Sequence, residues 1–402
     1  MSAVYENLTT LIETFGARPA TSEAEARLRD YLARRLQERG LKVFDQPFRT
    51  VPSFTAAWLV VSLMYVLSGV GAWFASGAWA ILLALLSPLA MALYWGLVSG
   101  KWDVMRLFPQ RESANLIAIA PARQAVKRRV VLMAHIDSTR ATLLWHPNTV
   151  KNFGKSFILQ TLILGLHTLG ALGVMADALT GLSMGWAKWL MVQGTLVSLW
   201  GLFVLIHREV VLDWVQGAND NGSGTAVVLT LMERLSENPL DETEVWGVFT
   251  GAEEVGTPAG AFAFEREYGW QLHDAEFVIV DHVGLGEPRY LLAEAMLPRQ
   301  KAHPDMVRRF EDLARHHSEW RLAPSEVPCG AYTDALPFLI GRYQAIALWC
   351  EQEPGVPPNW HWRTDTLENV SPQALERVGH LLEVYLRDKP VHSAMPETHH
   401  QA

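Results

Sequence analysis

The chain has 402 residues, of which 50% are hydrophobic and 19% are charged, and its formal net charge is −8. This composition excludes a disordered chain, because disordered segments lack the apolar residues that build a core. An acidic balance also argues against nucleic-acid binding, which requires a basic face, so we expect no nucleic-acid partner. Two cysteines, Cys329 and Cys350, are too few for a disulfide framework.

The first segment, residues 1–49, is charged and has a helical pattern. It lacks the short basic start and apolar stretch of a secretory signal. Ser22 followed by Glu25 predicts a capping box at the start of a helix, and Gly40 predicts its end.

A long apolar run follows, from Thr50 to Gly100, and it contains no Asp, Glu, Lys or Arg. A bilayer core of ~30 Å requires about 20 apolar residues in a helix, so this run is long enough for two spans. Glycines and tryptophans cluster in its middle, at 71–79. The sequence therefore predicts a transmembrane hairpin with helices at 54–74 and 78–99.

A second hairpin is predicted from two further uncharged stretches, 156–176 and 189–206. The alternative is the helical core of a soluble protein, but soluble helices usually keep a polar stripe, and stretches such as 81–86 have none. His167 lies inside the third predicted span, where a neutral imidazole hydrogen-bonded across helices is the favoured interpretation and a functional group is the alternative.

Basic residues flank the bases of both predicted hairpins, whereas the tips carry only Lys188. Cytoplasmic flanks are usually rich in Lys and Arg, so the soluble part should lie in the cytoplasm. We expect an integral, multi-pass protein of a prokaryotic plasma membrane, with the lipid bilayer as a partner and a cytoplasmic catalytic domain.

The remaining residues alternate between apolar strands and helical patterns. Strands are expected at 130–134, 245–249 and 277–280 and near 115–119, and helices at 222–237, 303–317 and 371–387. This alternation predicts an α/β fold with a mostly parallel sheet that is covered on both faces.

Polar residues follow these strands where the chain leaves the sheet. Functional groups of parallel sheets gather at the carboxyl ends of the strands. The residues concerned are His135 and Asp137 after the first strand, Glu253 and Glu254 after the next, Asp281 after the third, Asp220 in a loop that opens a helix, and His361 near the end. Several buried acids would be costly as bare charges, whereas imidazole and carboxylate groups together form a zinc ligand set. In a Glu-Glu pair, one carboxylate can bind metal while its neighbour acts as a base toward water.

With these residues in this order, the soluble part resembles the co-catalytic di-zinc exopeptidases, a family that includes bacterial aminopeptidases, aminopeptidase Y, glutamate carboxypeptidase and the glutaminyl cyclases. The resemblance implies an α/β/α sandwich with a mostly parallel mixed sheet, here with four transmembrane helices inserted as two hairpins. It implies two zinc ions per chain: His135 and Asp281 would bind one, Glu254 and His361 the other, and Asp220 would bridge both. Glu253 would be the general base, Asp137 would orient His135, and the Asp220–Asn221 peptide would be cis.

The chain departs from the family in two places. The second hairpin separates His135 from Asp220, where soluble relatives have a short loop. Trp360 stands where several aminopeptidases have a tyrosine that helps to stabilise the oxyanion, and glutaminyl cyclases have tryptophan there. Trp360 is therefore a candidate oxyanion or substrate contact.

We expect a membrane-integrated zinc metallopeptidase, an aminopeptidase that removes amino-terminal residues from peptides. The alternatives are a glutaminyl-cyclase-like zinc acyltransferase and an inactive scaffold or receptor on the same fold. Short tethers should hold the metal centre near the membrane, with loops 138–155 and 208–219 lining its entrance, so that amphiphilic or membrane-derived peptides are the expected substrates. The expected order is peptidase domain at 1–53, 101–155 and 208–390, hairpins at 54–100 and 156–207, and a flexible tail at 391–402.

Overall fold

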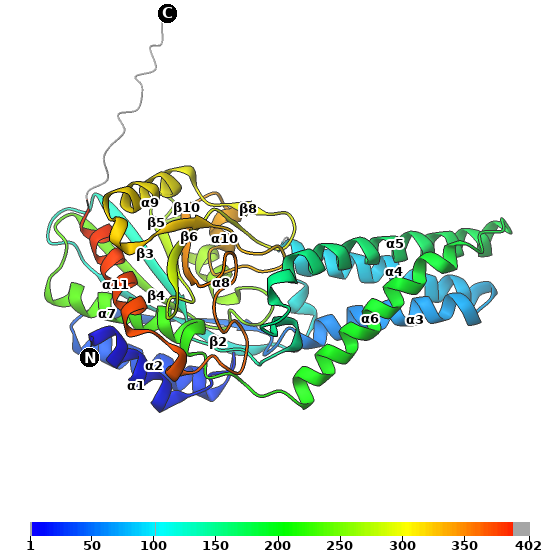
Figure 1. The fold of residues 1–402 in the computed structure, drawn as a ribbon, viewed down its shortest axis with the longest axis horizontal. Helices are drawn as coiled ribbons and strands as arrows, with labels where there is room; N and C mark the ends of the chain where they lie inside the picture. Colours follow the sequence, from blue (N-terminus) through cyan, green and yellow to red (C-terminus); the bar gives the residue numbers. More distant parts are fainter. Residues whose placement is uncertain (1, 101, 389–402) are drawn as a thin grey trace, which may run out of the picture.

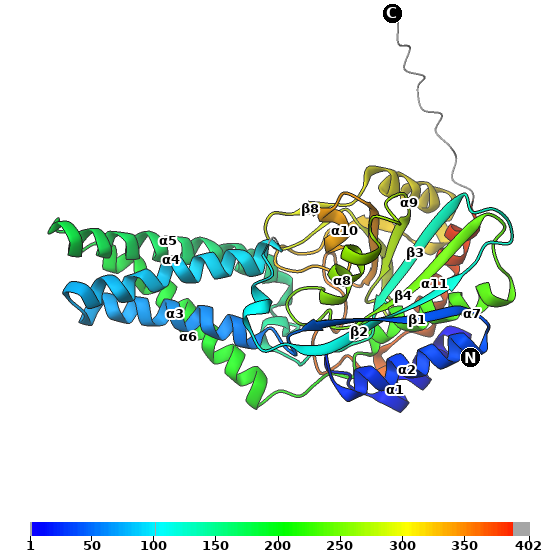
Figure 2. The ribbon, with the colours of Figure 1, turned by 180° about the vertical axis from the view of Figure 1, so that it is seen from behind.

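The computed structural model describes residues 2–100 and 102–388. The predicted tail at 391–402 lies outside the described residues. Most of the chain forms an α/β body, and four long helices project from one end of it (Figure 1). The same arrangement is seen from behind in Figure 2.

The body contains an eight-stranded mixed sheet in the order β1-β2-β4-β3-β5-β10-β6-β9, with a separate pair, β7 and β8. The four central strands, β4, β3, β5 and β10, are parallel to one another, whereas β1 and β2 extend one edge in antiparallel fashion. The strands are β1 Lys42–Thr50, β2 Arg111–Ala120, β3 Arg128–His135, β4 Thr243–Thr250, β5 Glu276–Val280, β6 Glu287–Leu291, β7 Ala293–Glu294, β8 Gln300–Lys301, β9 Ala323–Ser325 and β10 Gln344–Glu351. The predicted strands are thus confirmed, and each extends beyond its apolar run.

The central strands are apolar on both faces because each face is covered by helices. Along β3, Val130 and Leu132 belong to one buried cluster and Val131 and Met133 to the other, as the two-residue side-chain period requires. The first cluster includes residues of α1, α2, α7, α9 and α11, and the second includes residues of α8 and α10. The predicted mostly parallel sheet with two covered faces is therefore confirmed.

The helices of the body begin and end close to the predicted positions. They are α1 Ala3–Phe15, α2 Glu23–Glu38, α7 Gly224–Glu237, α8 Ala259–Tyr268, α9 Pro304–His316, α10 Leu336–Ile340 and α11 Pro372–Arg387. The capping box at α2 is only half formed. Ser22 Oγ accepts from the N–H of Glu25, but the Glu25 carboxylate accepts from Thr21 instead of from Ser22.

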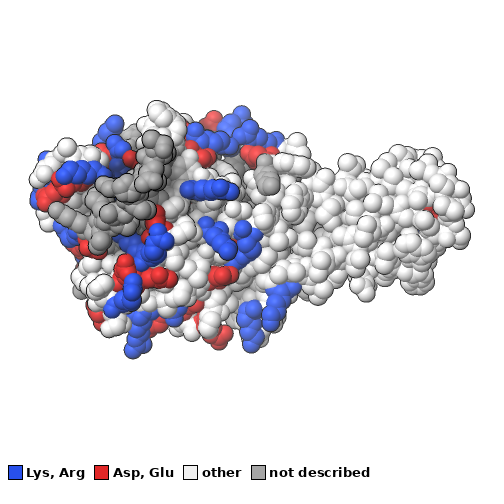
Figure 3. All heavy atoms as spheres, turned by 90° about the horizontal axis from the view of Figure 1, so that it is seen from above, with Lys and Arg blue, Asp and Glu red and all other residues white. Residues whose placement is uncertain are grey.

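The projecting helices are α3 Thr55–Phe74, α4 Gly77–Ser99, α5 Phe153–Thr180 and α6 Ala187–Val210. All four are long and apolar enough to cross a membrane. Viewed from above, the projecting part is almost free of charged side chains, unlike the body (Figure 3). The predicted limits of α3 and α4 are correct within a residue, but α5 and α6 are longer than predicted. The prediction counted uncharged residues and so stopped before the charged ones, whereas the helices continue through them. These charged residues are Lys155, Asp177, Lys188 and Arg208.

A hydrogen-bonded cluster joins these helices around His167, which is fully buried. Its Nδ1 lies 2.9 Å from Ser87 Oγ on α4, and its Nε2 lies 3.4 Å from Thr195 Oγ1 on α6. The ring of Tyr65, on α3, meets the imidazole edge-on at 5.0 Å. The predicted hydrogen bonding of His167 across helices is confirmed, and it joins all four helices.

Close packing at this cluster predicts that Gly194 cannot be enlarged. A Cβ at Gly194 would lie 2.6 Å from Cβ of His167, so Gly194→Leu must separate α5 from α6. We expect Gly194→Leu to lower the stability of the purified protein by about 1–3 kcal/mol, seen as a lower Tm in detergent. Gly165→Leu is the matched control, because a Cβ at Gly165 meets nothing within 4 Å; equal melting of the two variants would contradict the packing.

Candidate metal centre

The parallel strands bring the predicted residues to one edge of the sheet. His135 is the last residue of β3, Asp281 directly follows β5, and Glu253 and Glu254 come shortly after β4. These strands are neighbours in the sheet and run in the same direction, so their carboxyl ends meet. The hydroxyl of Thr225, on α7, donates to the carbonyl of His135 and fixes the end of β3.

Asp220 lies in a tight turn, Ala218–Ser223, that leads into α7. Its peptide bond to Asn221 is cis, as the family resemblance implies. The turn is bonded to the segment after β5: Ser223 Oγ accepts from Val283, and Asn219 Oδ1 accepts from Gly284. These bonds fix the distance between Asp220 and Asp281.

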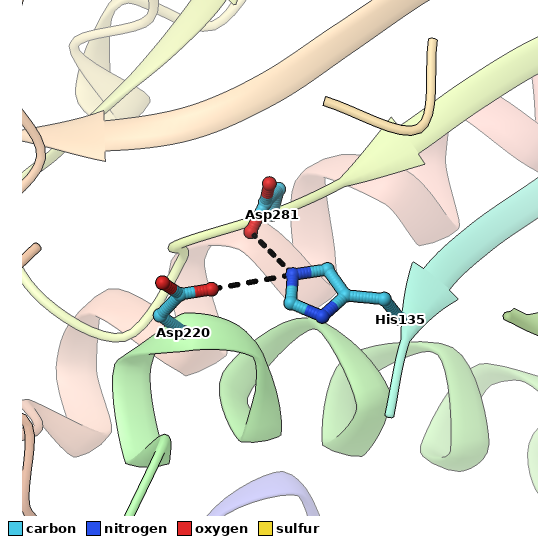
Figure 4. Close-up of side chains that lie close together, drawn as sticks. All are labelled: His135, Asp220 and Asp281. Atoms are coloured by element: carbon cyan, nitrogen blue, oxygen red, sulfur yellow. Dashed lines mark ion pairs between the residues drawn. The ribbon is translucent and has the colours of Figure 1, made fainter. Parts of the chain in front are cut away.

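The first group of ligand atoms surrounds His135 (Figure 4). Its Nε2 lies 3.2 Å from Oδ1 of Asp220 and 3.6 Å from Oδ1 of Asp281. The three side chains come from β3, the turn before α7 and the end of β5, and they point toward one another.

The second group shares the other oxygen of Asp220. Nε2 of His361 lies 3.0 Å from Asp220 Oδ2 and 3.0 Å from Oε1 of Glu254. Asp220 therefore presents one oxygen to each group, which is the arrangement expected of a bridging carboxylate. The five residues predicted as metal ligands are brought together by the structure.

The donor set fits divalent cations. Both carboxylate oxygens of Asp220 and Oε1 of Glu254 are buried and accept no hydrogen bond from the described residues, although histidine nitrogens lie 3.0–3.2 Å away. Nitrogen and oxygen atoms that share a tetrahedral zinc ion, with bonds of ~2.0–2.1 Å, are separated by roughly 3.3 Å. Buried acceptors without donors are costly, and a cation among them would remove that cost.

Glu253 lies beside both groups and is buried. Burial raises the pKa of its carboxyl well above the usual value, and the nearby carboxylates of Glu254 and Asp334 add to the rise. A buried carboxyl group beside both groups of ligand atoms is placed to exchange a proton with a water molecule between them.

Asp137 makes contacts beyond the one predicted. Its carboxylate accepts from the N–H groups of Glu253 and Glu254, each at 3.0 Å. Nδ1 of His135 lies 3.4 Å from Oδ1 of Asp137 and 3.2 Å from the carbonyl oxygen of the same residue. Asp137 thus positions the Glu-Glu pair as well as the His135 ring.

His282 was not predicted as a site residue, although it adjoins Asp281. Its Nδ1 lies 2.8 Å from Oδ1 of Asp281, and its Nε2 lies 3.1 Å from Oδ2 of Asp220. Burial alone would raise the pKa of Asp220, but His282, with His135 and His361, holds it well below the usual value. The sequence feature that could have predicted His282 as a site residue is its position directly after Asp281, a predicted ligand.

Buried groups without a sequence signal hold the loops of the centre. The Arg18 guanidinium donates to the carbonyls of Ile136, at 2.8 Å, and Gly217, at 2.9 Å. It therefore ties the loop after β3 to the loop before Asp220. Burial lowers the pKa of Arg18 to about 10, so the group stays charged at neutral pH.

Two buried carboxylates hold the backbone on either side of the centre. Asp365 accepts from the N–H groups of Asn219 and Asp220, at 2.6 and 3.1 Å. Glu25 accepts from the N–H of Ala252, at 2.9 Å, where φ is +52°. This bond stabilises a left-handed conformation that alanine rarely adopts, directly before the Glu-Glu pair.

Trp360 is buried against the centre, as its position before His361 suggested. Its ring centroid lies 5.7 Å from that of His361. The ring centroid of Trp145 lies 4.6 Å from that of the same imidazole. Both tryptophans line the cavity that contains the metal-ligand groups, and so does Tyr332. Neither Trp145 nor Tyr332 was predicted, because both come from loops without strand or helix periodicity.

The predicted entrance is correct for only one of the two loops. Leu144, Trp145 and Phe153, from or next to the 138–155 loop, line the cavity, but no residue from 208–219 does so among the described residues. The 208–219 loop instead pairs with the start of the other loop, where the N–H of Ala141 donates to Asp213 and the N–H of Val215 to Thr139. The length of a loop limits how far it can reach, but it does not determine whether the loop faces the cavity.

Comparisons with known proteins agree with this geometry. Residues 205–386 match Peptidase family M28. Aminopeptidase YwaD of Bacillus subtilis (strain 168) is 24% identical over 207 residues, a match that spans 49% of this chain and 43% of that protein.

Solved structures with the same fold include both enzyme types considered from the sequence. A glutaminyl cyclase of Bacteroides thetaiotaomicron superposes with a TM-score of 0.55 at 15% identity, covering 96% of this chain and 97% of that one. A zinc aminopeptidase of Bacillus subtilis superposes with a TM-score of 0.54 at 16% identity, covering 94% and 92%. The predicted resemblance to the zinc exopeptidase and glutaminyl cyclase family is thus confirmed, and the fold alone does not separate the two enzyme types.

The shared carboxylate predicts how metal is lost. Because Asp220 faces both groups of ligand atoms, Asp220→Ala should lose all or nearly all of the zinc that the wild type binds. Elemental analysis of dialysed protein measures this loss. Asp312→Ala, at an exposed acid on α9, is the control and should bind as much zinc as the wild type. Retention of one ion by Asp220→Ala would contradict a bridging role.

Proposed function

We propose that this protein is a membrane-integrated zinc aminopeptidase with two zinc ions. The observation that carries the proposal is the Asp220 carboxylate, which presents one oxygen to His135 and Asp281 and the other to Glu254 and His361. Glu253 is adjacent and free to act as a base. Similarity to an aminopeptidase and to Peptidase family M28 supports the same activity.

The charges around the cavity favour an amino terminus over a carboxyl terminus as the group recognised. Its lining includes four acids, Asp220, Glu253, Glu254 and Asp281, whereas no lysine or arginine lines it among the described residues. A carboxypeptidase needs a cation to bind the terminal carboxylate of its substrate. The described lining supplies no such cation, so aminopeptidase activity fits the site better.

Zinc bound by the five ligands would polarise the scissile carbonyl and make water more acidic. Glu253 would take a proton from the attacking water and deliver it to the leaving amine. Asp137 would keep Glu253 and Glu254 in place through their N–H groups, since it accepts from both.

Two side chains are candidates to donate a hydrogen bond to the developing oxyanion. Trp360 lines the cavity, and its indole N–H is a hydrogen-bond donor. Tyr332 lines the same cavity, and burial raises the pKa of its hydroxyl well above the usual value, with the Glu253 and Glu254 carboxylates adding to the rise. Tyr332 therefore remains a protonated donor at neutral pH and could replace the tyrosine that is absent at position 360.

A glutaminyl-cyclase-like acyltransferase is the second candidate. Trp360 favours it, because tryptophan precedes the last ligand in glutaminyl cyclases, and a glutaminyl cyclase is among the similar structures. Both groups of ligand atoms are complete here, however, which favours the two-metal peptidase.

Membrane integration rests on the four apolar helices α3 to α6. We propose that they form two transmembrane hairpins and that the basic residues at their bases keep the catalytic body in the cytoplasm. The large side chains on their outer surfaces support this assignment, because Leu162 is 62% exposed and Trp189 is 67% exposed. Such an apolar surface is stable in lipid and not in water.

The activity is tested with three substrates side by side: an aminoacyl anilide, a peptide with a blocked amino terminus and free carboxyl terminus, and a peptide with amino-terminal glutamine. We expect zinc-loaded protein to hydrolyse the anilide, to leave the peptide with the blocked amino terminus intact, and to release glutamine from the third peptide without cyclising it. Glu253→Gln should keep its zinc and lose ~10²–10⁴-fold in kcat, as expected when a general base is removed. Cyclisation of the glutamine peptide would support the second candidate, and inactivity toward all three would refute both.

The orientation is tested with single cysteines in a background of Cys329→Ser and Cys350→Ala. Ser76→Cys, at the exposed tip between α3 and α4, should react with an impermeant thiol reagent added to intact cells. Ser318→Cys, on the exposed surface of the body, should react only after lysis. Labelling in the opposite order would place the metal centre outside the cytoplasm.

A further inference from the structure

The cavity at the metal centre continues into the projecting helices. It has a volume of about 210 Å³, and its lining passes from the metal-ligand groups to residues of α3, α5 and α6. The residues contributed by these helices include Trp58, Ser62, Gln160, Val197, Trp200 and Gly201. The wall is largely apolar and carries no charged group there, so this part of the cavity suits a hydrocarbon group and not a polar one.

This part of the cavity reaches far along α6. Arg208 and Glu209 mark the charged end of the helix, whereas Val197 still lines the cavity. At a rise of ~1.5 Å per residue, Val197 is about 16 Å from Arg208 along the helix axis. Half the hydrocarbon thickness of a bilayer is ~15 Å, so the cavity extends to the level of the lipid tails if α6 spans the membrane.

The cavity also opens toward the outer surface of the helices. Trp200 lines the cavity and is nevertheless 56% exposed, so its side chain forms part of both surfaces. Its neighbours on the outer face of α6 are apolar and exposed as well, since Leu199 is 46% and Phe203 is 50% exposed. The opening is therefore surrounded by residues that would face lipid.

The packing of α5 against α6 explains the opening. At the far end the helices touch closely, because a Cβ at Gly170 would lie 2.6 Å from the carbonyl oxygen of Ala187. Toward the body the two helices diverge (Figures 1 and 2). A Cβ at Gly201, nearer the body on α6, would meet no atom of α5 within 4 Å and only Ser62 Oγ of α3, at 3.3 Å. The helices thus form a wedge that is closed at the tip and open near the metal centre.

We infer that peptide substrates reach the metal centre sideways from the bilayer, between α5 and α6. The substrate class is a peptide with a free amino terminus and a long apolar group near it, such as an acyl chain on a side chain. Its amino end lies at the acidic metal centre and its apolar group lies in the cavity between α3, α5 and α6. This inference rests on the proposed aminopeptidase function and names the substrate class of the same site.

The cavity wall is also exposed outside the bundle, where we expect small substrates to enter from water. Leu144, outside the bundle, also lines the cavity and is 40% exposed. A short soluble peptide can therefore reach the metals without passing between α5 and α6. This second opening provides an internal reference, because a change confined to the sideways route should leave short peptides unaffected.

The test compares two peptides of the same sequence and free amino terminus, one with a hexadecanoyl chain on the side chain of its third residue and one without. Zinc-loaded protein is reconstituted in phosphatidylcholine vesicles, and kcat/KM is corrected for partitioning of the acylated peptide. We expect the wild type to prefer the acylated peptide by roughly tenfold or more, since the chain gains apolar contacts in the cavity. Gly201→Leu adds a large side chain to the cavity wall, toward Ser62 of α3, and should reduce the space for the chain and abolish this preference. The kcat/KM for the short peptide should stay within about twofold of the wild-type value.

Gly165→Leu is the control, because it adds the same side chain to the same hairpin but toward open space. It should keep the preference. Two results would refute the sideways route and leave the aminopeptidase proposal intact. One is equal kcat/KM for the two peptides in the wild type, and the other is a preference in Gly201→Leu as large as that of the wild type. Hydrolysis of neither peptide by the wild type would refute the aminopeptidase proposal itself.

A second measurement does not depend on activity or on Gly201→Leu folding normally. An acylated peptide with a benzophenone at the end of its chain is photolysed with zinc-free protein in vesicles. We expect crosslinks within 156–160 of α5 and 197–201 of α6, and competition by the same peptide without benzophenone. Crosslinks that fall only on the outer faces of α3 and α4 would overturn the inference.

Discussion

The burial of several carboxylates at one point is the constraint on which the rest of this structure depends. Asp137, Asp220, Glu253, Glu254 and Asp281 are all buried, together with Asp365 nearby. Their negative charge is opposed by three imidazoles, by backbone N–H groups and by the Arg18 guanidinium, and two cations would complete the balance. Burial raises the pKa of Asp365 to about 7, and the Asp220 carboxylate adds to the rise.

The same constraint explains why the loops around the centre are so well bonded. Three carboxylates that are not candidate ligands accept backbone N–H groups. Asp137 accepts those of the Glu-Glu pair, Asp365 accepts those of Asn219 and Asp220, and Glu25 accepts that of Ala252. These bonds stabilise the charges and also fix the positions of the ligands. Glu25 shows both effects, because burial raises its pKa to about 8 while its acceptor bonds hold a residue in a left-handed conformation. Electrostatic stabilisation and geometric precision are provided by the same contacts.

The sequence predicts the sheet and the metal-ligand groups well because both depend on local pattern. Buried parallel strands are continuous apolar runs, and the residues that follow them must meet at one edge, so His135, Asp281 and the Glu-Glu pair could be placed without a structure. Arg18 and Tyr332 could not, since their contacts with the centre join residues that are far apart in sequence and have no repeating pattern. The entrance was predicted only in part for a similar reason: the length of the 208–219 loop limited its reach, but its pairing with Ala141 and Thr139 turned it away from the cavity.

The position of the second hairpin has a consequence for how the protein is made. His135 precedes α5, whereas Asp220, Glu254, Asp281 and His361 all follow α6. During synthesis, the residues of either metal position are therefore completed only after both hairpins have left the ribosome. A chain that stops within the second hairpin has His135 as its only member of the five candidate ligands, and it cannot assemble the candidate metal centre. The order of the sequence thus delays assembly of this centre until the helices that would carry it into a membrane have been synthesised.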